Sequence, residues 1–110
     1  MLLYKLHNWI LSENLDWNEL SLNKNAIFLL EQNINKINWS NLSLNPNAIH
    51  LLQNNIKNID WYNLSCNPNA IHLLEKNINH INWSRLSSNI KAIHILENNK
   101  SNIDWSIEGN

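Results

Sequence analysis

Hydrophobic positions recur along this chain with a fixed period of 22 residues. A tryptophan marks each period, at Trp17, Trp39, Trp61, Trp83 and Trp105. The four blocks that end at the last four tryptophans read NELSLNKNAIFLLEQNINKINW, SNLSLNPNAIHLLQNNIKNIDW, YNLSCNPNAIHLLEKNINHINW and SRLSSNIKAIHILENNKSNIDW. Ala, Ile and Leu keep their places in every block, with Asn and Ser between them. A repeat of this length predicts units that stack on one another, because no single unit has enough apolar surface to form a core.

One segment of the unit has the period of a helix. Residues 46–55 read PNAIHLLQNN, and their apolar stripe is Ala48, Ile49, Leu52 and Ile56. This spacing predicts one face of an α-helix. Asn45 is a suitable N-cap, Pro46 suits the first helical position, and Asn55 tolerates a left-handed conformation that ends a helix. We therefore predict a helix of about ten residues in each unit.

A second, shorter helix is predicted to begin at each tryptophan. Asp60 is an N-cap candidate directly before Trp61, and Asp or Asn stands at the same place in the other units. Ile59 and Leu64 occupy the flanking positions of a hydrophobic staple. The fixed Ser and Asn positions between the two helices are expected to act as capping and turn groups.

These elements predict an all-α solenoid of about four two-helix repeats in a single domain. The expected boundaries are 1–17 for an N-terminal capping helix and partial repeat, 18–39, 40–61, 62–83 and 84–105 for the repeats, and 106–110 for a tail. A leucine-rich-repeat-like fold or a β-solenoid is the alternative, because leucine-rich units have 20–29 residues. The leucine-rich consensus itself is not reproduced, and the chain has only one glycine.

Composition narrows the function classes. Eight basic and nine acidic residues give a formal net charge of -1, without the basic cluster that a phosphate-binding surface needs. Nearly a quarter of the residues are asparagine. The single cysteine, Cys66, suits a reducing compartment, and we expect neither a signal peptide nor a membrane span. An intracellular protein that does not bind membranes is therefore expected, and nucleic acid is a less favoured partner than protein.

The motif N-P-N-A-I-H-L-L-E-x-N…I-x-W-x-x-L-S carries a family resemblance. It is most complete from Asn67 to Leu86. At this motif the chain resembles short Trp-containing repeat proteins that giant DNA viruses encode in many copies. The resemblance covers about residues 12–105, and the last unit departs from it at Ile90 and Lys91. It implies a viral repeat protein with an interaction role in the cytoplasm of the host cell, and it brings no catalytic residues.

A ladder of side chains lies away from the predicted apolar stripe. We expect it to form an exposed interaction ridge, and its members are Phe28, His50, His72 and His94. Glu residues follow three positions later in three of the four units. A His–Glu pair at this spacing is compatible with general-base chemistry, but it is equally typical of a surface pair on a helix. No nucleophile or phosphate loop accompanies it, so we expect no enzyme, no metal site and no cofactor.

Specificity is expected where units differ and side chains are exposed. These variable positions are Glu19, Asn41, Tyr62, Asn63 and Arg85. The tryptophan ladder is expected in the core, with each indole N–H bonded to a backbone carbonyl.

The C-terminal end of the repeat array is a candidate for self-association. Its apolar residues are Ile93, Ile95, Leu96 and Ile107. No full unit follows them, so a two-fold pairing of identical ends is expected to cover them. The sequence thus favours a non-catalytic scaffold that binds an unidentified protein partner. A homodimer through this C-terminal end is also expected. The alternatives are a self-assembling structural protein and, less favoured, a nucleic-acid-binding protein.

Overall fold

Each unit contains two short α-helices, and in the first three units one turn of 3-10 helix follows them. The computed structural model describes residues 15–99. The first helices of the units are α2 (Trp17–Leu22), α4 (Trp39–Leu42), α6 (Trp61–Leu64) and α8 (Trp83–Leu86). The second helices are α3 (Ile27–Glu31), α5 (Ile49–Gln53), α7 (Ile71–Glu75) and α9 (Ile93–Asn98). The 3-10 turns are η1 (Ile34–Lys36), η2 (Ile56–Asn58) and η3 (Ile78–His80).

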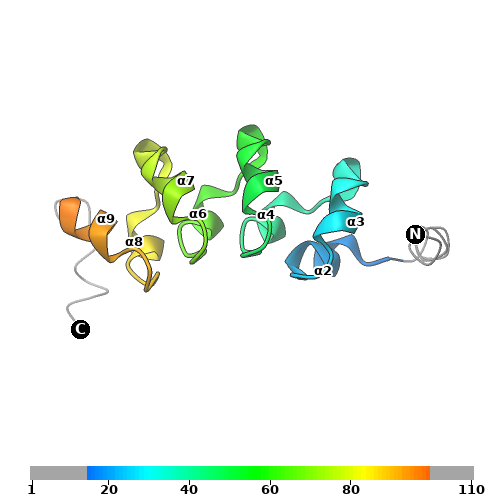
Figure 1. Cartoon of the computed structure of the whole chain (residues 1–110), viewed down its shortest axis with the longest axis horizontal. Coiled ribbons are helices and arrows are strands. Elements are labelled where there is room, and N and C mark those ends of the chain that lie inside the picture. Colours follow the sequence, from blue (N-terminus) through cyan, green and yellow to red (C-terminus); the bar gives the residue numbers. More distant parts are fainter. Residues whose placement is uncertain (1–14, 100–110) are drawn as a thin grey trace.

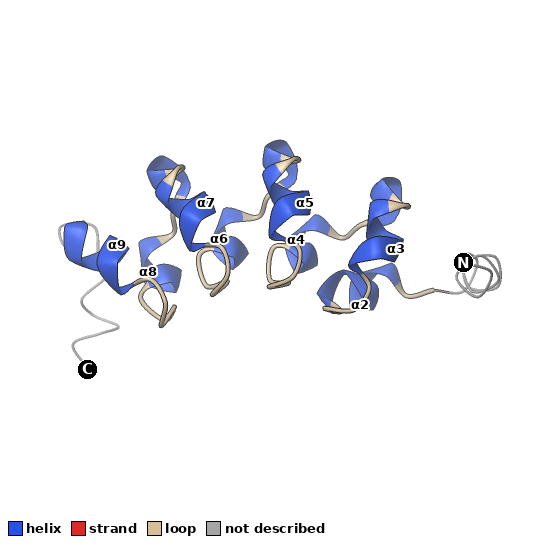
Figure 2. Cartoon of the chain, in the orientation of Figure 1, coloured by secondary structure: helices blue, strands red, loops and turns tan. Residues whose placement is uncertain are grey.

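The units stack side by side into an elongated solenoid. The first helices form one row and the second helices a parallel row, and successive units follow one another along the long axis (Figure 1). Figure 2 shows helices and loops only, and residues 15–99 contain no strand. In this part of the chain the predicted all-α solenoid is confirmed, and a leucine-rich or β-solenoid arrangement is excluded. The predicted N-terminal capping helix lies outside the described residues.

The core is a column of identical side chains, one set from each unit. Its fully buried members are Leu30, Leu42, Leu52, Leu64, Leu74 and Leu86. The fixed alanine of each later unit is also buried completely, at Ala48, Ala70 and Ala92. A methyl group at this position lets neighbouring units approach closely, and any larger side chain would hold them apart.

The short helices begin as predicted. Asp60 caps α6, since its side chain accepts a hydrogen bond from the backbone N–H of Asn63 at 3.2 Å. Asp16 caps α2 in the same way, with the N–H groups of Asn18 and Glu19 as donors. These caps satisfy N–H groups that have no partner within the helix.

The second helix is shorter than the ten residues predicted, for two reasons. Asn55 does not adopt a left-handed conformation: its φ is -138°, and its side-chain amide donates to the Leu51 carbonyl at 2.8 Å. That bond takes the place of the backbone N–H of Asn55, which bonds the Leu52 carbonyl instead, and the helix ends. At the other end Asn45 and Pro46 lie in a turn, and Ala48 is the residue that precedes α5. Ile56 therefore falls in η2 and is 39% exposed, whereas Leu51 is buried.

Asn45 does not cap a helix: its Oδ1 accepts from the backbone N–H of Asn47 within the turn at 3.0 Å, and Ala48 precedes α5. Its side-chain amide bonds the preceding unit. The Asn45 Nδ2 group donates to the Ser21 and Asn23 carbonyls, both at 3.0 Å. Asn67 and Asn89 occupy the same position in the next two units and make the same pair of bonds 22 residues further on. All three asparagines are almost fully buried. We call Asn45, Asn67 and Asn89 the asparagine ladder.

The fixed serines bond the residue that caps the next short helix. Ser43 Oγ donates to the Trp39 carbonyl at 2.8 Å and accepts from the backbone N–H of Asp60, the N-cap residue of α6, at 2.9 Å. Ser21 and Ser65 make the equivalent bonds to Asn38 and Asn82. Each unit is thus tied to both of its neighbours by buried polar groups that have partners.

Replacing Asn67 with Asp tests the asparagine ladder. Asn67→Asp leaves the Ser43 and Asn45 carbonyls without donors and sets a buried anion against them. We expect a loss of roughly 3–5 kcal/mol in unfolding free energy, measured by urea denaturation. Asn79→Asp is the matched control, because Asn79 is exposed on the 3-10 turn η3. Equal losses in both variants would contradict the structural role of the ladder.

Ala70 and His72 test the facing of the second helix. Ala70→Asp buries an unpaired carboxylate in the column of alanines, with an expected cost of about 3–5 kcal/mol. His72→Ala removes a side chain that is 95% exposed, so the melting temperature should be unchanged. Similar melting temperatures for the two variants would show that the helix faces another way.

Candidate interaction surface

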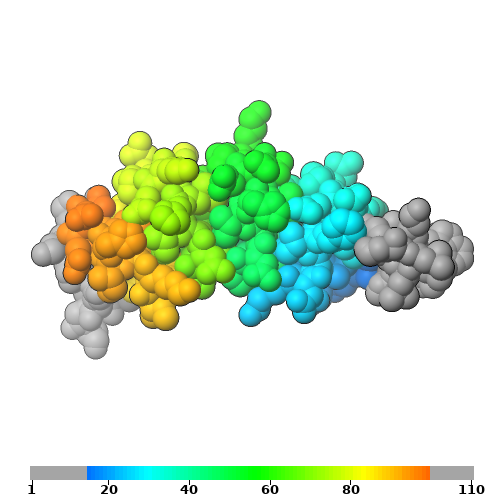
Figure 3. Space-filling view, viewed as in Figure 1, coloured from blue at the N-terminus to red at the C-terminus, as the bar shows by residue number. Residues whose placement is uncertain are grey.

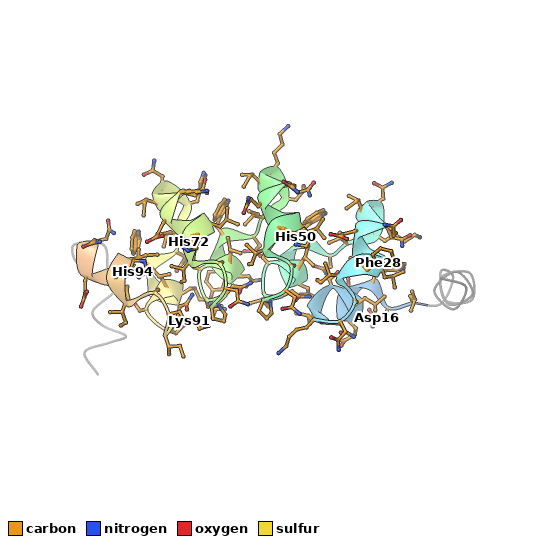
Figure 4. The ribbon with its side chains drawn as sticks, viewed as in Figure 1. Asp16, Phe28, His50, His72, Lys91 and His94 are labelled. Atoms are coloured by element: carbon orange, nitrogen blue, oxygen red, sulfur yellow. The ribbon has the colours of Figure 1, made fainter. Side chains whose placement is uncertain are left out.

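The predicted ridge follows the second helices along the solenoid. Figure 4 shows Phe28, His50, His72 and His94 one after another along the long axis, from α3, α5, α7 and α9. Phe28 is 53% exposed, and the three histidine side chains are 55–95% exposed. The structure therefore brings these four residues together as one surface, which we call the ridge.

Carboxylates connect the ridge from unit to unit. His50 Nε2 bonds Glu31 of the preceding unit, and His94 Nε2 bonds Glu75 of its own preceding unit. Glu75 also lies 3.4 Å from His72 Nδ1 within α7. The sequence spacing indicated only the pair within one helix. The missed contacts join residues 19 positions apart, a separation that becomes a contact only once the units are stacked.

His72 has no glutamate of the preceding unit as a partner, because Gln53 stands at the position of Glu31 and Glu75. The middle of the ridge thus carries the most exposed imidazole. Among residues 15–99 no three His, Cys, Asp or Glu side chains are grouped so that they could hold a metal ion. The ridge offers hydrogen-bonding groups to a partner in an open, solvated setting.

The five variable positions do not share one environment. Tyr62 is 54% exposed, and Glu19 is exposed as predicted. Asn41 and Asn63 are half-buried, since their amides donate to the Asn18 and Ser40 carbonyls of the preceding units at 3.0 and 2.9 Å. The prediction that they are exposed is wrong, because these amides join units.

Arg85 is also half-buried, in a cluster found at one junction of the solenoid. Its guanidinium lies 4.5 Å from the centre of the Tyr62 ring, and Nη2 donates to Cys66 Sγ at 3.0 Å. Cys66 in turn donates to the Asn63 carbonyl at 3.2 Å. Tyr62, Cys66 and Arg85 each replace a different residue type in the other units, so this cluster distinguishes the junction of the third and fourth units.

The tryptophans border the core and do not fill it. Trp17, Trp39, Trp61 and Trp83 are half-buried against the leucine column. No carbonyl among the described residues accepts their indole N–H groups, so the predicted hydrogen bond is wrong. At two of them a residue 19 positions later lies on the ring. His80 stacks on Trp61 with centroids 4.8 Å apart, and Lys36 Nζ lies 5.8 Å from the centre of the Trp17 ring.

The expected apolar C-terminal face is smaller than predicted. Ile95 and Leu96 are 2% and 7% exposed because they turn into the core of their own unit. Ile93 is 57% exposed, and Ile90, in the position held by proline in the two preceding units, is 84% exposed. Ile107 lies outside the described residues.

Comparisons of the chain with protein-family models, with curated proteins and with solved structures found no match. No helix within residues 15–99 has the length and apolar character needed to cross a membrane.

Leu74 and Glu75 are adjacent in α7, but Leu74 is buried in the core and Glu75 contacts the ridge. Substitutions at these two positions therefore compare the core with the surface. Leu74→Ala should lower the unfolding free energy by about 2–5 kcal/mol, because a fully buried side chain leaves a cavity. Glu75→Ala should lower it by less than about 1 kcal/mol, because its imidazole partners are exposed and water screens the interaction. Urea unfolding midpoints measure both. A loss at Glu75 as large as that at Leu74 would mean that the ridge maintains the fold and is not a free surface.

Proposed function

We propose that this chain is a non-catalytic scaffold that binds a protein partner along the ridge. The observation that carries the proposal is a continuous line of exposed aromatic and imidazole side chains, one from each unit, above a uniform leucine core. Solenoids bind partners through such extended surfaces, because every unit adds an equivalent contact. Figure 3 shows the units as successive bands across one elongated body.

The chemistry of the ridge favours a polar protein surface as the partner. Imidazoles alternate with Glu31 and Glu75, so the ridge presents both hydrogen-bond donors and carboxylate acceptors. Catalysis by these groups has no support, since general bases act in sites that exclude water and these histidines are more than half exposed. Nucleic-acid binding is disfavoured by the nearly balanced charge of 8 basic and 9 acidic residues.

The sequence resemblance to viral repeat proteins extends the proposal to a viral protein that acts inside the host cell. The free, half-buried Cys66 suits a reducing compartment.

Two triple variants with one substitution per unit test the proposal. The ridge variant carries His50→Ala, His72→Ala and His94→Ala. The matched control carries Asn35→Ala, Lys57→Ala and Asn79→Ala, which share one exposed position on the 3-10 turns. Tagged wild type and both variants are used to capture proteins from host-cell extract, and the affinity of each captured protein is then measured in purified form.

We expect the wild type and the control to bind the same partner, and the ridge variant to bind it at least about tenfold more weakly, which is a loss of 1.4 kcal/mol. Equal binding by all three forms, or a loss in the control alone, would contradict the assignment of the ridge.

A further inference from the structure

The first described unit presents a side that every later unit buries against its predecessor. Glu19, Leu20, Leu22 and Asn23 line a hollow of about 320 Å³ on this side. Asn23 is exposed, whereas its counterparts in the asparagine ladder are almost fully buried. Leu20 is half-buried, whereas the leucines at its position in the later units have no exposed surface. Within residues 15–99 no unit packs against this side.

The side-chain amide bonds between units all run in one direction, so the two sides of a unit differ. The side toward the N-terminus carries side-chain amide donors. The side toward the C-terminus carries the carbonyls that accept from them. Asn67 reaches the Ser43 and Asn45 carbonyls, and Asn69 reaches the Pro46 carbonyl at 2.9 Å. The donor side of one unit is therefore complementary to the acceptor side of another unit. Two donor sides, or two acceptor sides, are not complementary.

The fourth unit presents the acceptor side. Its Ser87, Asn89 and Ile90 carbonyls stand where the Ser43, Asn45 and Pro46 carbonyls stand two units earlier. Within residues 15–99 no further asparagine follows to donate to them. Residues 105–110 read WSIEGN, and Glu108 and Gly109 stand at positions where the other units hold a leucine and a fixed serine. By contrast, the segment that begins at Trp17 reads WNELSLN and has both of these residues.

We propose that two copies of this chain join head to tail through these sides, with the first unit of one copy seated on the fourth unit of another. Asn23 Nδ2 of the first copy donates to the Ser87 and Asn89 carbonyls of the second, and Asn25 Nδ2 donates to its Ile90 carbonyl. The junction repeats the contacts made by Asn67 and Asn69 inside the chain.

This pairing differs from the two-fold pairing that the sequence suggested. Ile95 and Leu96 are already buried, so little apolar surface remains for a symmetric contact between C-terminal ends. A head-to-tail contact is heterologous, and it leaves one free side of each kind on every assembly. Association therefore continues beyond the dimer as concentration rises.

Charge reversal across the junction tests the proposal. Inside the chain, Cys66 contacts Arg85 from the next unit. At the proposed junction, Ser88 of one copy occupies the position of Cys66, and Glu19 of the other copy occupies the position of Arg85. These two residues therefore face each other. Ser88 and Glu19 are exposed, so substitutions there should leave the fold intact. Ser88→Glu sets two carboxylates against each other, and the double variant with Glu19→Arg replaces that repulsion with an ion pair.

Sedimentation velocity of the full chain over a concentration series gives the readout. We expect the wild type to associate without a plateau at the dimer, Ser88→Glu to weaken association about tenfold or more, and the double variant to restore it. An equimolar mixture of the two single variants should also associate better than Ser88→Glu alone.

Three outcomes would overturn the proposal. The first is a wild type that stays monomeric at all concentrations, which would mean that the chain covers these sides itself. The second is association that stops at the dimer. The third is a loss of association in Ser88→Glu that Glu19→Arg does not restore. His72→Ala and Asn35→Ala are the controls, and neither should change association. Because the ridge lies on another surface, loss of partner binding and loss of association are separate results.

Discussion

The solenoid depends on the hydrogen bonds of one buried asparagine in each later unit. Burying an amide is costly unless its donors find acceptors. Asn67 finds both of its acceptors in the preceding unit, the Ser43 and Asn45 carbonyls. The amide is therefore satisfied only when the two units are stacked in one relative position. The leucine column tolerates small shifts along its length, but this amide does not. The asparagine therefore sets the register of the stack, and the leucines provide the larger share of its stability.

This constraint explains why function is expected at the surface. The serines, alanines and ladder asparagines are all used between units, so they cannot vary without breaking the stack. Residue type varies at exposed positions such as Tyr62, where the other units have Asn or Ser. The ridge histidines His50 and His94 bond half-buried carboxylates, and their imidazoles stay more than half exposed. The core thus uses the same residue types in every unit, and the ridge presents side chains that a partner can contact.

The period, the helical class and the caps at Asp16 and Asp60 could be predicted from the sequence, since they follow from local spacing and side-chain chemistry. The length of the second helix could not be, because Asn55 serves equally well as a left-handed terminator or as a side-chain donor, and only the stacked structure selects between them. The exposed ridge followed from helix geometry, whereas its His50–Glu31 contact depends on the stacking of units. Nothing local to Asn45 reveals that its partners lie in another unit.

Hydrogen exchange of the asparagine side chains tests the central claim most directly. Side-chain amide signals in an NMR spectrum of the monomeric protein distinguish protected Nδ2 groups from solvated ones. The structure predicts slow exchange at Asn45, Asn67 and Asn89, and fast exchange at Asn23, which occupies the same position on the open side. Equally fast exchange at all four positions would show that these amides do not bridge the units, and the account of the stack would be wrong.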